Sequence, residues 1–273
     1  MTLGWLAPEV TTVALCWRLD RRDGVSIGFT SHDRDLDIDG LTYRAAPGMT
    51  PSAISVSDGL DVDTLDVSGA LTSDAISAGD LSAGRWDGAG LRLFAIDWTD
   101  PAAGGLHLTR GELGDVSIRD EAFSAELRGP TALLEQPVAE QTSPECRASL
   151  GDRRCRVDLA PRTRLTRIAS VAGATVLQVA DAEPSANAYG YGRIDWIEGP
   201  NSGLASLIAA SSATTLTLRE APPFAVAAGL LVRLTEGCDR ALTTCRDRFH
   251  NMANFRGEPY LPGADLLARY PGA

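Results

Sequence analysis

The sequence predicts a mainly β protein, because short stretches of alternating apolar and polar residues recur along the chain and turn-forming clusters separate them. It contains no heptad pattern and no repeat of fixed period. A length of 273 residues is enough for one or two domains whose cores require neither disulfides nor metals. We expect two consecutive β regions that meet near residue 160.

The first region begins with a strand expected at 13–20, VALCWRLD, in which apolar side chains alternate so that one face is buried and the other polar. The dipeptides Asp23-Gly24 and Asp39-Gly40 favour tight turns and therefore predict two hairpins.

The remainder of the first region contains a buried strand expected at 91–98 and an alternating pair within 114–129, with a turn near residue 120. Short helices are expected at 73–78 and 131–135, each after a turn-type residue.

The second region, 161–235, contains five short apolar stretches separated by turn clusters such as residues 199–203. Closely spaced short strands are typical of a small β-barrel or meander. We expect this region to form a compact unit of its own.

The composition restricts the partners and the location of the protein. The net charge is −11, and all 25 basic residues are arginines. A protein that binds duplex DNA presents a basic surface, so the acidic balance argues against such binding. No apolar run is long enough to span a bilayer, and the N-terminal residues lack the pattern of a secretory signal. We expect synthesis in the cytoplasm without export.

Five cysteines are present, and four of them form two pairs. Cys16 lies inside the first expected strand, where a free cysteine packs like a small apolar residue. Eight residues separate Cys146 from Cys155, and six separate Cys238 from Cys245. The 82 residues between the two pairs are the second β region. Because the ends of a domain often lie close together, the pairs are expected to meet at its base.

Three interpretations of these four cysteines are open. They are unrelated reduced thiols, two disulfides, or one four-thiolate metal site. A reducing compartment disfavours disulfides. Structural zinc sites usually contain two cysteines separated by two to four residues, and neither pair has that spacing. The wider loops favour a [4Fe–4S] cluster, with zinc or no metal as the alternatives.

A run of alternating aspartates gives a weaker indication of a metal site. The alternating residues Asp33, Asp35, Asp37 and Asp39 resemble the start of a calcium loop, but position twelve would be Ala46 and no flanking helices are expected. In a strand these aspartates line one solvated face. Such a face also suits the wall of a channel through which DNA passes, since it repels phosphate.

The three histidines, His32, His107 and His250, do not form a recognisable catalytic group. His250 follows Cys245 by five residues, which raises the alternative of a redox or cysteine-dependent enzyme with a metal site. No nucleophile elbow, phosphate-binding loop or zinc-protease motif is present. We expect a protein that is not an enzyme.

Several segments resemble the tail hub proteins of gene transfer agents and related phages: FTSHDRDL, AELRGPTALLEQ, CRASLGDRRC, GCDRALTTCRDRF and NMANFRGEPYLPG. The cysteine spacing is similar to the iron–sulfur site of tail-tip protein L of lambdoid phages. The resemblance covers essentially the whole chain. One departure is Glu258, where the family often has an aromatic or bulky residue.

The resemblance implies a domain order and a ligand set. Residues 1–140 would form tail-tube-like β-barrel or sandwich hub domains, 141–160 a linker with the first cysteine pair, and 161–235 the inserted β-barrel. Residues 236–273 would complete the cluster site and form a C-terminal strap. The implied ligands of a [4Fe–4S] cluster are Cys146, Cys155, Cys238 and Cys245.

The resemblance also implies a structural role in the virion tail tip, or baseplate, after assembly in the bacterial host cytoplasm. The chain would form a homotrimeric ring between the distal tail protein ring and a tip or receptor-binding (megatron-like) protein, with a tail peptidase as a further candidate partner. DNA would pass through without specific binding. Phe255, Arg256 and Tyr260 are candidate anchors in the strap, either on its own domain or on a neighbouring subunit.

Overall fold

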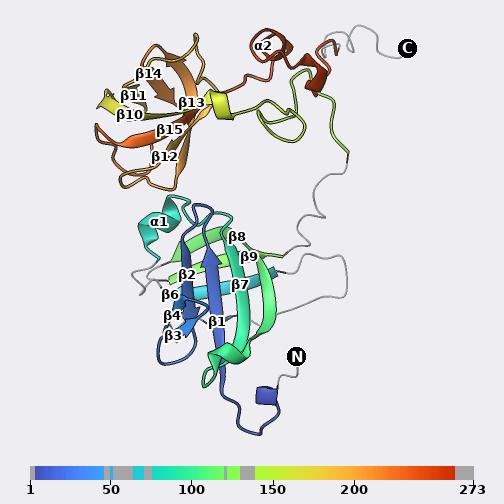
Figure 1. The fold of residues 1–273 in the computed structure, drawn as a ribbon, viewed down its shortest axis with the longest axis vertical. Coiled ribbons are helices and arrows are strands. Elements are labelled where there is room, and N and C mark those ends of the chain that lie inside the picture. The colour runs from blue at the N-terminus through green and yellow to red at the C-terminus, as the bar shows by residue number, and fades with distance from the viewer. Residues whose placement is uncertain are drawn as a thin grey trace. The chain divides into compact units, whose positions relative to one another are not determined.

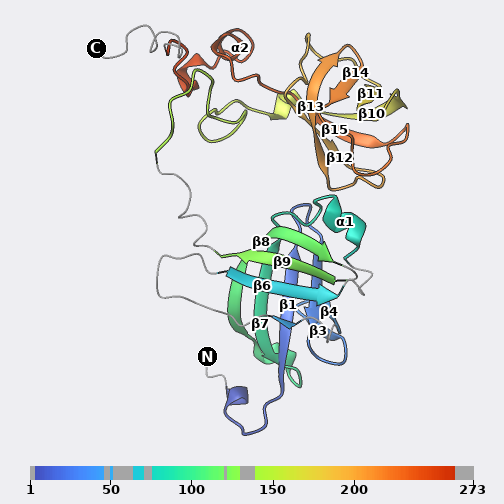
Figure 2. The same cartoon turned by 180° about the vertical axis from the view of Figure 1, so that it is seen from behind.

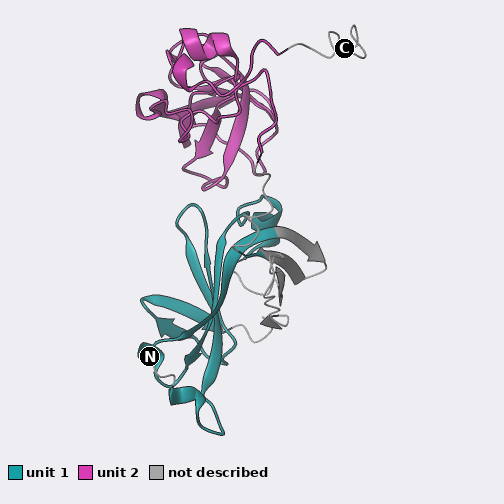
Figure 3. Cartoon of the chain, turned by 90° about the vertical axis from the view of Figure 1, so that its right-hand side faces the viewer, with its two compact units in different colours: residues 1–137 teal, residues 138–273 magenta. Residues whose placement is uncertain are grey.

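A computed structural model describes residues 4–45, 50–51, 64–70, 76–119, 122–129 and 139–261. The chain divides into two compact units, residues 1–137 and 138–273 (Figures 1 and 3). Both units are built mainly from antiparallel strands, so the expected fold class is confirmed. Among the described residues, no helix has the length and apolar character needed to cross a membrane.

The first unit contains one nine-stranded sheet in the order β3-β4-β2-β1-β7-β8-β9-β6-β5. The sheet curls into a half-barrel, so that β6, β8 and β9 run across β1 and β7 when seen from behind (Figure 2). Its strands are β1 Val13–Asp20, β2 Ser26–Thr30, β3 Leu36–Ile38, β4 Leu41–Ala45, β5 Thr50–Pro51, β6 Thr64–Ala70, β7 Gly90–Asp97, β8 Leu106–Arg119 and β9 Ala122–Arg128.

Strand β1 occupies the expected residues but packs apolar side chains on both faces. Trp17 and Leu19 pack into one apolar cluster with β7, while Ala14 and Cys16 pack into a second cluster on the other side. The expectation of one polar face was therefore wrong for the first half of β1, because the second cluster covers Ala14 and Cys16. In the second half that face stays polar, with Arg18 and Asp20 forming a partly exposed ion pair. Cys16 is fully buried, as expected of a packed thiol.

The two predicted hairpin turns are confirmed. β1 pairs with β2 across the Asp23-Gly24 turn, and β3 pairs with β4 across Asp39-Gly40, where both turn residues have positive φ angles of 49° and 78°. Positive φ at both positions matches the right-handed twist of the flanking strands.

The helix expected at 73–78 was misplaced. Helix α1, Ala78–Ser82, begins where that helix was expected to end, because the Ser77 side chain accepts a hydrogen bond from the Asp80 backbone N–H at 3.1 Å and caps the first turn. The helix expected at 131–135 and the turn near residue 120 lie outside the described residues.

The second unit contains a closed six-stranded barrel in the order β10-β11-β14-β13-β12-β15. Five strands were expected, but the first apolar stretch turns back on itself and forms two. The inward side chains, including Ile194, Ile208 and Val232, are fully buried and form a separate core. The strands are β10 Thr163–Val171, β11 Val176–Val179, β12 Arg193–Trp196, β13 Ala205–Ser212, β14 Thr215–Leu218 and β15 Leu231–Thr235.

Two glycines allow the chain to leave the barrel beside the loop before β12. A Cβ on Gly237 would lie 2.1 Å from the Gly190 carbonyl oxygen, and one on Gly192 would lie 2.2 Å from the Thr235 carbonyl oxygen. These contacts are with backbone atoms, which cannot rotate away. Only glycine lets the two segments cross at this distance.

We predict that Gly237→Ala lowers the free energy of unfolding of the second unit by about 1–3 kcal/mol or more, as overpacking does. Gly173→Ala is the matched control, since a Cβ there would have no atom within 4 Å. Its effect on the thermal unfolding midpoint should be neutral or slightly stabilising. Equal midpoints for the two variants would contradict the crowding at Gly237.

Beyond the barrel, the chain continues through helix α2, Leu242–Asp247, and the short 3₁₀ turn η5, Met252–Asn254. Other 3₁₀ turns are η1 Gly4–Leu6, η2 Pro101–Ala103 and η4 Ala160–Arg162, the last of which leads into β10. The two cysteine pairs therefore lie on the irregular segments that precede and follow the barrel.

Candidate metal centre

Four cysteines from both sides of the barrel line one small cavity. Its walls include the thiols of Cys146, Cys155, Cys238 and Cys245 and the apolar side chains of Ala148, Leu150, Val157 and Phe249. All four thiols are free rather than joined in disulfides. The structure thus brings together the four cysteines that the sequence singled out, although 82 residues separate the pairs.

Backbone contacts hold the two cysteine segments against each other. The Cys146 backbone N–H donates to the Arg240 carbonyl at 2.9 Å, which joins the first segment to the second. Asn251 completes the connection, because its backbone N–H donates to the Cys245 carbonyl at 3.0 Å and its side-chain amide donates to the Cys155 carbonyl at 2.6 Å. The arrangement therefore depends on main-chain geometry as well as on the thiols.

The loop that carries Cys155 is organised by one carboxylate. Asp152 accepts hydrogen bonds from the backbone N–H groups of Ser149, Arg154 and Cys155 at 2.6–2.8 Å. Partial desolvation raises the pKa of Asp152, but these three donors outweigh it and lower the pKa overall. The aspartate therefore stays ionised and fixes the turn.

Three of the four sulfur atoms accept hydrogen bonds. The Arg240 backbone N–H donates to the Cys238 sulfur at 3.4 Å, and the Arg256 backbone N–H donates to the Cys146 sulfur at 3.3 Å. The Asn251 side-chain amide lies 3.7 Å from the Cys155 sulfur. Such N–H groups suit thiolate ligands, whose metal clusters are tuned by hydrogen bonds to sulfur.

Burial disfavours the charged form of two of the cavity thiols. Burial raises the pKa of Cys245 to about 11, and the neighbouring thiols of Cys146, Cys238 and Cys155 raise it further. Burial likewise raises the pKa of Cys238. A metal centre that binds these sulfurs as thiolates would displace their protons.

The donor set fits an iron–sulfur cluster. Four soft ligands face one cavity, and N–H groups are directed at their sulfurs. Within the described part of the chain, no three Cys, His, Asp or Glu side chains are placed to hold a single metal ion.

Four arginines of these segments are paired with carboxylates: Arg147 with Glu258 and Glu140, Arg154 with Glu140 and Asp152, Arg246 with Asp247, and Arg248 with Glu236. Arg240 lines the cavity. Of these pairs, the one between Arg248 and Glu236 is the most buried.

A buried carboxylate connects the barrel to the wall of the cavity. Glu236 follows the last barrel strand, is nearly buried, and accepts hydrogen bonds from Arg162 at 3.0 Å and Arg248 at 2.6 Å. The same two guanidinium groups lie 4.6 and 4.9 Å from the ring centre of Phe249, which lines the cavity. We call these four residues the Glu236 clamp.

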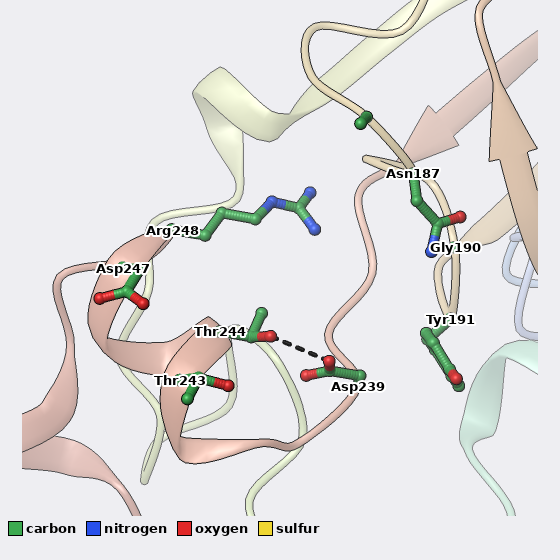
Figure 4. A pocket seen from close by; sticks show the side chains of 9 residues that line it. Asn187, Gly190, Tyr191, Asp239, Thr243, Thr244, Asp247 and Arg248 are labelled. Atoms are coloured by element: carbon green, nitrogen blue, oxygen red, sulfur yellow. Dashed lines mark hydrogen bonds between the residues drawn. The ribbon is translucent and has the colours of Figure 1, made fainter.

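Helix α2 lies beside the barrel loop at residues 186–191, and a polar pocket of about 370 Å³ separates them (Figure 4). Arg248 extends from the end of α2 toward this loop and donates to the Ala188 carbonyl at 2.7 Å. Asp239 holds the start of the helix, because its carboxylate accepts from the Thr244 hydroxyl at 2.9 Å.

Comparison with known proteins identifies the family. Residues 2–158 match the family described as baseplate hub protein, N-terminal attachment domain. The chain belongs to the baseplate hub protein family. Residues 187–265 match a second family, described as phage conserved hypothetical protein BR0599. No curated protein matches the chain.

A solved structure extends this assignment over the whole baseplate hub chain. A chain from the virion of a native gene transfer agent particle shares 38% sequence identity and superposes with a TM-score of 0.85. The match covers 98% of this chain and 94% of the other. The resemblance seen in the sequence motifs to a hub protein of phage-like particles is therefore supported at the level of family and fold.

Arg256 and Glu258 of the C-terminal strap contact residues 143–147 of the same chain. The Glu258 backbone N–H donates to the Ser143 carbonyl at 2.7 Å, and its carboxylate accepts two hydrogen bonds from Arg147 at 2.6 and 2.9 Å. Arg147 in turn donates its backbone N–H to the Arg256 carbonyl at 2.9 Å. Glu258, noted as a departure from the family pattern, is thus the residue that fastens the strap; Tyr260 remains 90% exposed.

The strap contact gives a prediction for acidic pH. Hydrogen bonds from Arg147 and Ser143 lower the pKa of Glu258 from 4.5 to about 2. Because the folded-state pKa is depressed, the contribution is fully present above about pH 4.5 and is lost as the pH falls toward 2. Amide hydrogen exchange of residues 143–147 and 254–261, corrected for intrinsic rates, should accelerate in this window. In Glu258→Gln, exchange of these amides should be fast both near pH 4.5 and near pH 2. Protection retained in this variant would show that the Glu258 carboxylate does not hold the strap.

Other residues considered in the sequence do not line the cavity. Asp33, Asp35, Asp37 and Asp39 are exposed on and beside β3, at one edge of the sheet. His250 is exposed and its backbone turns with a φ of 49°. The supporting residues Asn251, Asp152 and Glu236 were missed, since polar residues near cysteines have no distinctive spacing.

Proposed function

We propose that the chain is a structural, non-enzymatic hub at the distal end of a phage-like tail. The observation that carries this proposal is the match to a chain of a gene transfer agent virion, with 38% identity over 98% of this sequence. The baseplate hub family match over residues 2–158 supports the same role. At this identity and coverage, fold and position in a particle are commonly retained.

In this proposal, Cys146, Cys155, Cys238 and Cys245 hold a [4Fe–4S] cluster. When bound, the cluster supplies four metal–thiolate bonds between chain segments that flank the barrel. This chain's residues do the remaining work: Asn251 and Asp152 orient the cysteine loops, and Phe249 helps to exclude water. Because all four protein ligands are cysteines, no iron is left open for a substrate, and the role is structural.

The proposed mechanism is mechanical. Three copies would form a closed ring around the channel through which DNA leaves the particle. The ring would join the distal tail protein to the tip or receptor-binding (megatron-like) protein, and a tail peptidase is a further candidate partner. The acidic balance of the chain, −11 overall, would keep DNA from adhering to the wall.

Electron microscopy of particles tests this proposal. Particles produced without the chain should have tails that lack the distal ring and should fail to deliver DNA. Complementation with the intact gene should restore both properties. Particles with complete tail tips and normal delivery in the absence of the chain would overturn the hub assignment.

A further inference from the structure

A groove on the outside of the barrel has the composition of a protein-binding surface. It encloses about 450 Å³ and is lined by the arginines Arg193, Arg233 and Arg240, and by Tyr191 and Leu207. Tyr191 is 53% exposed and Leu207 is 54% exposed. Tyrosine and arginine are enriched among the residues that dominate binding energy at interfaces. We propose that this groove binds the acidic half, residues 1–137, of a second copy of the chain.

The position of Tyr191 is fixed before any partner binds. Its φ angle is +62°, which is uncommon for a bulky residue, and the close crossing at Gly192 and Gly237 holds this part of the backbone in place. The ring also lies 6.0 Å from the Arg219 guanidinium. An exposed aromatic side chain on a backbone of unusual conformation is a feature of functional sites.

Charge identifies the partner. Residues 1–137 contain 22 acidic and 10 basic residues, a net charge of −12, whereas residues 138–273 contain 14 and 15, a net charge of +1. Glu236 lines the groove but is already paired with Arg162 and Arg248. A second carboxylate, Asp195, lies between Arg193 and Arg233 at 3.3 and 3.0 Å, so these arginines outnumber the carboxylates and the groove keeps an excess of positive charge. Two different surfaces of one chain that attract each other form a head-to-tail contact, and such a contact generates a ring when the rotation between copies closes.

The groove also opens toward the cysteine cavity. Leu150, Cys238 and Arg240 line both. A second copy seated in the groove would therefore cover one wall of the cavity and limit access of water and oxygen to it. This inference rests on the proposed ring, but self-association of purified protein is measured independently of incorporation into particles.

Sedimentation of the purified full-length chain gives the first test. The wild type should self-associate, and Leu207→Glu should weaken this association about tenfold or more, as expected for an anchor residue. Tyr191→Asn, which tolerates the positive φ, should have a similar effect. Val171→Glu is the matched control, since Val171 is 43% exposed on the barrel but does not line the groove. Added salt should weaken the wild-type association.

Cross-linking identifies the surface that enters the groove. A chain carrying Leu207→p-benzoylphenylalanine is mixed with an isotopically labelled wild type and irradiated. Cross-links from position 207 to residues 1–137 of the labelled copy are expected. A monomeric wild type, equal weakening by Val171→Glu, or cross-links to residues 138–273 of the other copy would each overturn the proposal.

Discussion

Anaerobically purified wild-type protein is expected to be brown, to absorb visible light as thiolate-bound iron–sulfur clusters do, and to contain about four iron atoms per chain. Cys238→Ala should remove the colour and strongly destabilise residues 138–261. The reason is that metal-binding free energy becomes folding free energy in such a site, and it amounts to about 10 kcal/mol or more in structural zinc sites. Iron analysis, visible absorbance and thermal unfolding of the same preparation measure these effects together.

Cys16→Ala is the matched control for this experiment. Cys16 is fully buried in the sheet of the first unit, where its thiol lies 3.6 Å from the Thr30 hydroxyl. Its removal should leave colour and iron content unchanged. Wild-type protein that carries zinc or no metal would overturn the cluster assignment, whereas normal iron content in Cys238→Ala would remove Cys238 from the ligand set.

Glu236→Gln should cost about 3–5 kcal/mol of unfolding free energy in the second unit, which is the usual effect of breaking a buried ion pair. The Glu236 side chain is only 9% exposed and is shared by two arginines, so its neutral amide would leave both guanidinium groups without a compensating charge. The guanidinium of Arg248 has little freedom to respond, because it is also bound to the Ala188 and Gly237 carbonyls. Chemical denaturation followed by tryptophan fluorescence would measure the loss.

Asp247→Asn is the control on the same helix. The pair between Arg246 and Asp247 is comparably short, at 2.7 Å, but both side chains are more than half exposed. Exposed pairs contribute little, so no measurable shift is expected. Equal effects of the two substitutions would show that the Glu236 clamp is not a buried ion-pair network.

The sequence predicted the β class, the hairpins at Asp23 and Asp39 and the grouping of the four cysteines, because alternation, turn dipeptides and ligand types are local signals. It did not predict that β1 packs apolar side chains on both faces, since that depends on how far the sheet curls. The sequence also did not predict the Glu236 clamp. Arg162 and Arg248 come close to Glu236 only after the barrel has closed, so no local pattern indicates their contact.

The barrel begins and ends at strand partners, because Thr163 pairs with Thr235. Directly paired residues in antiparallel strands have Cα atoms only about 5 Å apart, a distance that a two-residue turn can bridge. The whole barrel is therefore an insertion whose first and last residues are adjacent in space. Such an insertion could be exchanged or shortened in related particles during evolution, while the segments that carry the cysteines keep their places.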